Sequence, residues 1–357
     1  MPARAACARE GGKRYDSKMS ESKAMIVGLR GHSVSEEERA FFLAERPWGY
    51  ILFARNIADA AQLRALTAEL RALSGDPKTP ILIDQEGGRV QRLRPPLAPN
   101  YPPAAEIGVL YRRDGRAGRR AAWLQGRLHA FDLTGYGINV DCLPVLDIPV
   151  PGSHDVIGNR AYGEEPESVA ALAGAAMEGL VAGGVLPIVK HIPGHGRAGA
   201  DSHLSLPVVD TPRAELDATD FRPFAAHATA PMAMTAHVVY SAVDAENPAT
   251  TSRRMIDDVI RGAIGFDGLL MSDDVSMKAL AGDFASRTRA IFAAGCDMAL
   301  HCNGDLDEMR EVAAETPRLA GDALRRADAA IAALAEPDDS REDALREEFD
   351  ALMRVTA

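Results

Sequence analysis

The chain has 357 residues, enough for two average domains or for one α/β barrel, which commonly reaches about 250 residues and more. Hydrophobic residues make up 46% and charged residues 25%, which is typical of a globular protein with a sizeable core. The 51 acidic residues outnumber the 40 basic ones and give a net charge of −11. This balance argues against nucleic acid or an anionic membrane as the main partner, because both bind basic surfaces.

No stretch approaches the roughly 18 uninterrupted apolar residues of a membrane-spanning helix. Residues 1–18 lack the apolar run of a secretory signal, and we interpret them as a disordered or artificially appended leader before a single domain over 19–357. The four cysteines form no CxxC pair, and Cys142 and Cys296 lie in apolar runs, where cysteine acts as a small hydrophobe. These features favour a reducing, cytoplasmic setting.

Short apolar runs alternate with helical patterns along the chain, without a repeat of fixed period. The runs are nearly unbroken and rich in Val, Ile, Leu and Met, which is typical of parallel strands covered on both faces. The runs predicted as strands are Ala24–Arg30, Gly49–Ala54, Pro80–Asp84, Ile138–Leu143, Val185–Lys190, Met232–His237, Gly268–Ser272 and Cys296–Leu300.

The segments between the runs have helical periodicity. Leucines recur at helical spacing in Asp59–Leu73, with Asp59 suited to the N-cap and Gly75 to the C-terminal stop. Glu165–Val181 carries a second apolar stripe. Strands alternating with helices predict a single (β/α)8 TIM-type barrel, in regular or irregular form, with closing helices from Asp305 onward. An open doubly wound sheet is the alternative, although no G-x-G-x-x-G follows the first run.

Charged or titratable residues cluster at the ends of four predicted strands. These clusters are Asp84–Arg89 (DQEGGR), Lys190–His191, His237 and Ser272–Asp274. Because barrel enzymes place catalysis at the C-terminal ends of their strands, we interpret the four clusters together as an active site.

The densest polar stretch is Lys190–Val209 (KHIPGHGRAGADSHLSLPVV), which predicts a long glycine-rich loop over the barrel mouth. Its histidines could ligate a metal or transfer protons. No HxH or HExxH spacing places two ligands on one face, so we expect neither a metal nor a cofactor. Asp201 lies two residues before His203, where a carboxylate would orient the imidazole and stabilise its charged form.

Two adjacent carboxylates, Asp273 and Asp274, follow the run Gly268–Ser272. Successive side chains leaving a strand diverge, so only one of them should face the barrel axis. We expect the other to cap a helix that begins near Val275. A mouth carboxylate opposite an acid/base suits cleavage of a glycosidic bond through a covalent intermediate. An aldol or amide-hydrolysing site fits equally, so the residues by themselves predict a hydrolase or a lyase.

Four motifs, taken together and in this order, resemble bacterial glycoside hydrolase family 3, in its β-N-acetylhexosaminidase branch of peptidoglycan recycling. They are Ile83–Leu93 (IDQEGGRVQRL), Ile157–Gly163 (IGNRAYG), Lys190–Val209 and Met271–Met277 (MSDDVSM). The resemblance covers Met25 to about Cys302. Arg197 and Ala198 replace the Asp-Thr that many relatives carry after PGHG, which leaves the Asp-x-His pair intact.

The resemblance implies a role for each matching residue. Asp273 would be the nucleophile and His203 the general acid/base, with Asp201 as its partner. Sugar hydroxyls accept hydrogen bonds from Lys and Arg and donate to Asp, so the matching cations and carboxylate suit a sugar site. The implied sugar-binding residues are Asp84, Arg92, Arg160, Lys190 and His191.

The implied reaction is retaining hydrolysis of a terminal, non-reducing β-linked N-acetylglucosamine, with an anhydro-muramyl peptide fragment of the cell wall as the expected substrate. A phosphorylase using the same intermediate is the runner-up, because an imidazole acid/base would not repel phosphate. A non-catalytic sugar-binding barrel and a metal-dependent amidohydrolase are further alternatives. We expect a monomer with no nucleic-acid or membrane partner. The runs occupy 24–300 and leave no room for the second α/β domain of larger relatives, so the barrel should supply its own acid/base.

Overall fold

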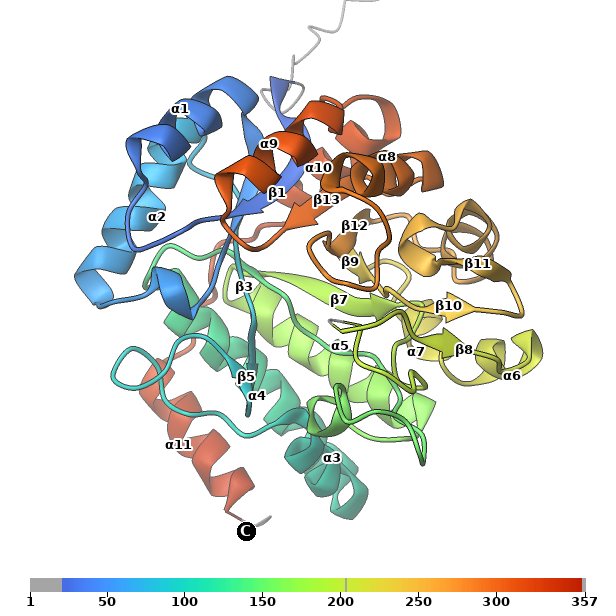
Figure 1. Ribbon diagram of the computed structural model, residues 1–357. Helices are drawn as coiled ribbons and strands as arrows, with labels where there is room; N and C mark the ends of the chain where they lie inside the picture. Colours follow the sequence, from blue (N-terminus) through green and yellow to red (C-terminus); the bar gives the residue numbers. More distant parts are fainter. Residues whose placement is uncertain (1–20, 203, 355–357) are drawn as a thin grey trace, which may run out of the picture.

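The strands close into a barrel in a computed structural model that describes residues 21–202 and 204–354. All neighbouring barrel strands are parallel, in the order β1-β13-β12-β9-β7-β6-β3-β2 (Figure 1). The barrel strands are β1 (Lys23–Gly28), β2 (Pro47–Leu52), β3 (Ile81–Ile83), β6 (Val140–Asp141), β7 (Leu186–Ile192), β9 (Met232–Thr235), β12 (Leu269–Asp274) and β13 (Met298–His301). Each overlaps one predicted run, so the predicted barrel is confirmed and the open doubly wound sheet is excluded. The expected leader 1–18 lies outside the described residues, as does His203.

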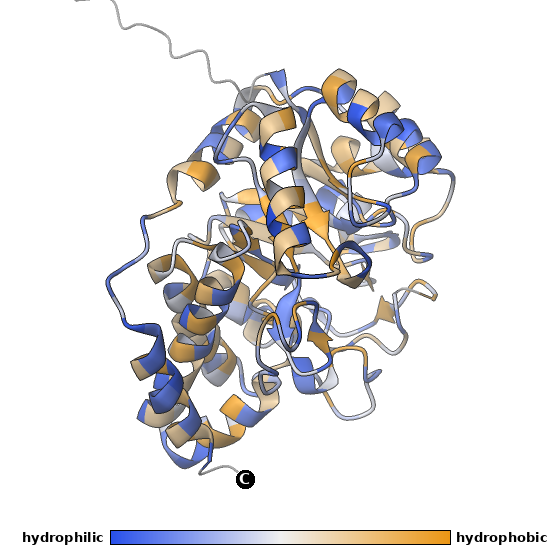
Figure 2. Ribbon diagram, turned by 90° about the vertical axis from the view of Figure 1, so that its left-hand side faces the viewer, coloured by the Kyte–Doolittle hydropathy of each residue, from blue (hydrophilic) through white to orange (hydrophobic). Residues whose placement is uncertain are grey.

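Helices wrap the outside of the barrel (Figure 1). Figure 2 shows hydrophobic strands inside helices that alternate hydrophobic and hydrophilic residues, as amphipathic covering helices do. The α-helices are α1 (Glu36–Glu45), α2 (Ala60–Ser74), α3 (Ala104–Arg113), α4 (Gly115–Thr134), α5 (Pro166–Ala182), α6 (Arg213–Ala218), α7 (Arg222–Ala226), α8 (Phe284–Ala294), α9 (Leu306–Glu315), α10 (Gly321–Ala332) and α11 (Glu342–Met353), and a π-helix spans Met255–Ala263. None of the described helices is long and apolar enough to cross a membrane.

Local sequence signals set the ends of α2, the helix predicted over Asp59–Leu73. Asp59 accepts hydrogen bonds from two backbone N–H groups of the first turn, at 2.9 Å each. These bonds satisfy donors that the start of any helix leaves unpaired. Gly75 ends the helix at φ 69°, a left-handed conformation that glycine adopts without steric penalty. The helix predicted over Glu165–Val181 is observed as α5.

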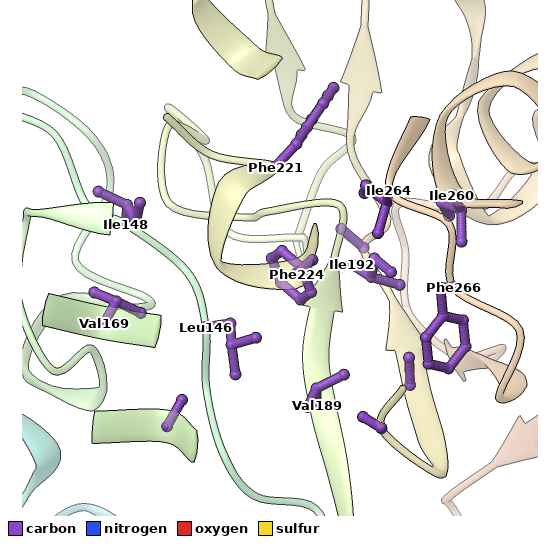
Figure 3. Packing of buried hydrophobic residues seen from close by; sticks show 14 of the residues in the cluster. Leu146, Ile148, Val169, Val189, Ile192, Phe221, Phe224, Ile260, Ile264 and Phe266 are labelled. Atoms are coloured by element: carbon purple, nitrogen blue, oxygen red, sulfur yellow. The ribbon is translucent and has the colours of Figure 1, made fainter. Parts of the chain in front are cut away.

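The strands have apolar side chains on both faces. Leu186 and Ile188 of β7 belong to the cluster that fills the barrel interior. Val189 instead packs in the outer cluster together with Phe224 of α7 (Figure 3). Because side chains alternate along a strand, Lys190 continues the inward phase of Leu186 and Ile188 and reaches the mouth of the barrel. The alternation in β7 therefore delivers a cation to the site.

Helix α10 covers the N-terminal end of the barrel. Its Ala327, Ala330 and Ile331 belong to the same apolar cluster as the barrel interior. Arg326 of this helix forms ion pairs with Asp297 at 2.9 Å and Asp267 at 3.0 Å, and these carboxylates stand just before β13 and β12. Packing and ion pairs therefore close this end of the barrel.

Loops with little regular structure surround the other end. A hairpin of β4 (Gln85–Gly87) and β5 (Val90–Gln91) follows β3, and a small sheet of β8 (Val208–Val209), β10 (Val239–Tyr240) and β11 (Asp244–Pro248) flanks the mouth. Between β7 and β8 the described residues form turns, as predicted for the glycine-rich loop.

Gly196 shows why that loop needs glycine. A Cβ atom there would lie 1.9 Å from the carbonyl oxygen of Ile148, so only glycine lets the two backbones approach this closely.

Candidate active site

A cavity of about 560 Å³ opens at the C-terminal ends of the barrel strands. This is the end where the sequence places its charged clusters and where barrel enzymes hold their active sites. The structure brings seven of the eight predicted site residues to its wall: Asp84, Arg92, Arg160, Lys190, His191, Asp201 and Asp273. The eighth, His203, lies outside the described residues.

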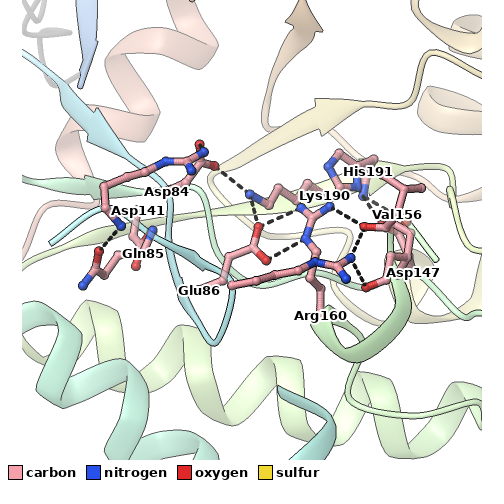
Figure 4. A network of polar contacts seen from close by, with 12 residues as sticks. Asp84, Gln85, Glu86, Asp141, Asp147, Val156, Arg160, Lys190 and His191 are labelled. Atoms are coloured by element: carbon pink, nitrogen blue, oxygen red, sulfur yellow. Dashed lines mark hydrogen bonds and ion pairs between the residues drawn. The ribbon is translucent and has the colours of Figure 1, made fainter. Parts of the chain in front are cut away.

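Lys190 is the centre of a buried ion network (Figure 4). Its side chain is 2% exposed, and its Nζ atom lies 2.9 Å from Asp84 Oδ1 and 2.6 Å from Glu86 Oε1. Arg92 donates to the other oxygen of Asp84 at 2.9 Å. Burial opposes the charge on Lys190, but the two carboxylates outweigh it and hold its pKa above the ordinary value. The lysine is therefore a fixed cation at the floor of the cavity.

Glu86 joins this network to a second cation. Arg160 binds it through two parallel hydrogen bonds of 2.8 Å, the bidentate geometry that a guanidinium and a carboxylate favour. Burial by itself would raise the pKa of Glu86, but the charges of Arg160 and Lys190 hold that pKa at about 2. For Asp84, burial is likewise outweighed, by Lys190 and Arg92, so its pKa lies below the usual range. Both carboxylates are ionised at neutral pH.

Asp141 shows what happens to a carboxyl nearby without such partners. It is fully buried at the end of β6 and accepts a hydrogen bond from the backbone N–H of Gln85 at 3.0 Å. Its Oδ2 atom has no hydrogen-bond partner among the described residues. Burial dominates and raises the pKa of Asp141 well above the usual value. The direct ion pairs of Asp84 and Glu86, which Asp141 lacks, therefore account for the opposite direction of its pKa.

His191 is oriented by a buried carboxylate, Asp147. Its Nδ1 atom lies 2.6 Å from Asp147 Oδ2, while the backbone N–H groups of His191 and His195 both donate to Asp147 Oδ1. Burial raises the pKa of Asp147, but His191 and these hydrogen bonds outweigh it and lower the pKa to about 2. An ionised Asp147 accepts a hydrogen bond from the N–H at Nδ1. This leaves Nε2 as the second functional atom of the ring.

The end of β12 carries Asp273 and Asp274. The register between β12 and β13 shifts between Met271 and Asp274, and such bulges commonly re-aim side chains beside active sites. Ser272 fills the gap that the shift leaves, because its hydroxyl accepts a hydrogen bond from the N–H of Leu300 at 3.0 Å. Asp273 Oδ1 accepts from the backbone N–H of Asp274 at 2.7 Å.

The prediction of a helix that begins near Val275 is wrong. Helix α8 begins at Phe284 and is capped by Asp283. Asp274 instead accepts hydrogen bonds from the backbone N–H groups of Ser276, at 3.0 Å, and Cys302, at 3.1 Å. A short polar side chain satisfies backbone donors in a turn as readily as at a helix start, so its sequence position did not distinguish the two.

The loop after β7 carries Asp201 to the same mouth. The carbonyl of Asp201 accepts hydrogen bonds from Leu204 and Ser205, so the chain turns tightly here. Its neighbour Ser202 accepts a backbone hydrogen bond from Ala279, beyond β12, at 3.2 Å, and its hydroxyl lies 3.0 Å from Nε2 of His195. These contacts join the loop to the segment that follows the Asp273 strand.

Two functional candidates, Glu86 and Asp147, received no role from the sequence. Glu86 belongs to the same D-Q-E-G-G-R segment as Asp84, and Asp147 follows the run Ile138–Leu143. Both residues follow a predicted strand, and this position is the same signal that marked the other clusters. Among the described residues no group of three His, Cys, Asp or Glu side chains could hold a metal ion.

Comparison with known proteins assigns the chain to a family. The profile of the glycosyl hydrolase family 3 N-terminal domain matches residues 17–331. A beta-hexosaminidase from Aromatoleum aromaticum is 40% identical over 283 residues, which cover 78% of this chain and 79% of that protein. A beta-hexosaminidase from Bordetella avium is 39% identical over 315 residues, 87% of this chain and 89% of the relative. The chain belongs to glycosyl hydrolase family 3.

Solved structures agree with this assignment. NagZ from Neisseria gonorrhoeae, in complex with N-trifluoroacetyl-D-glucosamine, superposes with a TM-score of 0.80 and 34% identity. The match covers 94% of this chain and 97% of that one. The chain is therefore a glycoside hydrolase of the β-hexosaminidase type, with a saccharide as its substrate.

Proposed function

We propose that this hydrolase is a retaining exo-β-N-acetylglucosaminidase that releases a terminal, non-reducing N-acetylglucosamine through a covalent glycosyl-aspartate. The observation that carries the proposal is the cavity, which collects Asp273, Asp201 and the Lys190 network at one barrel mouth. The N. gonorrhoeae neighbour binds an N-acylated glucosamine analogue, which supports the same class of sugar here.

In the proposed first step, a carboxylate oxygen of Asp273 attacks the anomeric carbon. The glycosidic C–O bond breaks, and His203 gives its proton to the departing oxygen. In the second step His203 takes a proton from water, whose oxygen attacks the anomeric carbon and releases Asp273. Two inversions give net retention. Asp201 serves as the partner that stabilises the charged imidazole of His203.

The sugar is held, in this proposal, by Asp84, Arg92, Arg160, Lys190 and His191. Hydroxyl groups of the sugar donate to Asp84 and accept from the cations. Because the network is already ordered and charged, little reorganisation is needed when the sugar binds. His191, with its Nδ1 atom on Asp147, offers Nε2 as an acceptor when the ring is neutral.

We further propose a GlcNAc-containing anhydro-muramyl peptide of the recycled cell wall as the substrate, and a cytoplasmic monomer with one domain over 19–357. The barrel and the helices that follow it, α10 and α11, support the single domain, since α10 packs against the barrel interior and α11 against α4. Size-exclusion chromatography with light scattering tests the monomer, and cell fractionation tests the location. Hydrolysis of purified muropeptides tests the substrate.

Replacing Asp273 by Ala tests the nucleophile. Turnover of an aryl N-acetyl-β-glucosaminide should fall at least about 10⁴-fold, because the bond-forming group is gone. Mass spectrometry of the wild-type enzyme with a slowly released substrate should locate the sugar adduct on the peptide that contains Asp273. An active Asp273→Ala enzyme, or an adduct on Asp274, contradicts the assignment.

Two product assays separate the remaining alternatives. The same enzyme should release free N-acetylglucosamine in the β configuration, with phosphate added or omitted. N-acetylglucosamine 1-phosphate appearing only with phosphate would identify a phosphorylase instead. An aryl β-glucoside should be a far poorer substrate, and equal rates on both sugars would remove the N-acetyl preference.

A further inference from the structure

His237 is a buried histidine beside the nucleophile strand to which the proposed reaction gives no task. It follows β9, is 0% exposed, and forms no part of the cavity wall. Its Nε2 atom lies 3.0 Å from the carbonyl oxygen of Asp274, and its Nδ1 atom lies 2.7 Å from the hydroxyl of Thr250. Thr250 is also fully buried.

The chemistry of these partners fixes where the protons are. A carbonyl oxygen only accepts hydrogen bonds, so Nε2 of His237 carries a proton and donates a hydrogen bond to the backbone carbonyl of Asp274. Burial lowers the pKa of His237, although the charge of Asp273 opposes the effect, so the ring is neutral and its Nδ1 atom has a lone pair. The one hydroxyl proton of Thr250 has two acceptors within reach, Nδ1 of His237 at 2.7 Å and the carbonyl oxygen of Ala236 at 3.1 Å. We assign the proton to Nδ1, the nearer acceptor. With that assignment Thr235, 2.8 Å away, donates to the Thr250 oxygen.

His237 makes its bond where the main-chain ladder has ended. Strands β9 and β12 pair in register only up to Met234 and Met271. Beyond that point the imidazole, at the end of β9, reaches the backbone of β12. On the opposite side the N–H of Val275 donates to the carbonyl of Leu300, in β13, at 2.9 Å. The peptide between Asp274 and Val275 is thus held from both neighbouring strands.

This peptide is next to the one whose N–H group binds the Asp273 carboxylate. A shift of the Asp274 backbone would therefore move the carboxylate that attacks the sugar. We propose that His237 is a positioning residue that holds the strand end carrying Asp273, and that Thr250 fixes the imidazole tautomer this task requires. The inference rests on the proposed role of Asp273 as nucleophile.

The test compares variants that keep or lose each hydrogen bond. His237→Leu removes the donor to Asp274 and should lower kcat/KM on an aryl N-acetyl-β-glucosaminide by about 100-fold, the cost of a misplaced reacting group. His237→Gln keeps an N–H donor and should recover at least about tenfold of that loss. The inhibition constant of N-acetylglucosamine should stay within about threefold of wild type, because the sugar contacts are intact.

Thr250 provides the second arm of the experiment. Thr250→Val has almost the same shape without the hydroxyl and should cost about tenfold in kcat/KM, whereas Thr250→Ser keeps the donor and should cost much less. If Thr250 acts through His237, adding Thr250→Val to His237→Leu should cause no further loss. His129→Gln, a change at another fully buried histidine, controls for general destabilisation and should retain wild-type kcat/KM. Thermal unfolding shows that each variant is folded.

The outcomes separate this inference from the proposed function. Wild-type kcat/KM in His237→Leu, equal losses in His237→Leu and His237→Gln, or additive losses in the double variant would overturn the inference. Those results leave the proposed function standing as long as Asp273→Ala is inactive. An active Asp273→Ala enzyme instead overturns the proposed function, whatever the His237 variants do.

Discussion

Charged side chains lie at both ends of the barrel, but they border a cavity at one end and a packed helix at the other. At the mouth, Lys190 and its carboxylates are buried beside a cavity. At the other end, Arg326 of helix α10 pairs with Asp267 and Asp297, while apolar side chains of the same helix join the interior core. Buried ion pairs lose hydration and add little net stability, whereas apolar burial stabilises directly. The mouth therefore holds charges in place for chemistry, and the far end holds the fold together.

Removing the central cation of the mouth should give the largest difference in activity between a variant of the mouth and a variant of the far end. Lys190→Met leaves Asp84 and Glu86 each with a single arginine, so kcat/KM should fall by about 10²–10³-fold and the free energy of unfolding by about 3–5 kcal/mol. Arg326→Met is the matched change at the far end. It should lower the free energy of unfolding by about 1–3 kcal/mol without lowering kcat/KM. Steady-state kinetics and urea unfolding measure both. Equal loss of activity in the two variants would contradict the division of roles.

Opening a gap in the packing of α10 should affect stability alone. Ile331 is 7% exposed within the interior cluster, so Ile331→Ala should lower the free energy of unfolding by about 2–4 kcal/mol and Ile331→Val by about 1 kcal/mol. Both variants should keep wild-type kcat/KM at temperatures where they are folded. A substantial loss of kcat/KM in the folded Ile331→Val enzyme would show that this end also shapes the active site.

The mouth should also be the more acid-sensitive end, because it contains His195. Burial, reinforced by His191, lowers the pKa of His195 to about 4. The unfolded chain, with a pKa of about 6.5, therefore takes up the proton first as the pH falls, and stability is lost on acidification. As the pH falls from 7 to 5, protonation of this histidine in the unfolded chain should lower the free energy of unfolding by about 2 kcal/mol.

Urea unfolding at the two pH values measures that loss. His195→Gln cannot take up the proton, so its stability should fall about 2 kcal/mol less than that of the wild type over this range. Ile331→Val should keep the wild-type pH dependence, since it changes no titrating group. An unchanged pH dependence in His195→Gln would mean that His195 is not the acid-sensitive group.

The smallest effect is expected at an exposed pair of the far end. Arg325 lies 2.8 Å from Asp267 and 3.2 Å from Asp322, and all three side chains are more than half exposed. Water screens such pairs, so Arg325→Ala should leave the unfolding midpoint and kcat/KM unchanged within error. A clear drop in the midpoint would mean that the exposed pairs also hold α10 in place.

Much of the site was predictable because barrel geometry brings strand ends together. Asp84 and Lys190 are 106 positions apart, yet each is the last residue of an apolar run, and parallel strands place such residues at one mouth. The mistaken helix near Val275 shows the limit of local patterns. Asp274 has a side chain that can cap a helix, but it accepts a hydrogen bond from the backbone of Cys302, just after the neighbouring strand β13, and no residue near Asp274 in the sequence reveals this partner.

The eight strands and most of the polar residues at the mouth could be predicted from the sequence, because they depend on local apolar runs and on the residues at the ends of those runs. Which of the polar residues pair depends on the closed barrel. Arg160 binds Glu86 from 74 positions away, and Asp147 orients His191 from 44. Such pairings depend on the register of the closed barrel, which places atoms within hydrogen-bond distance and leaves no periodic trace in the chain.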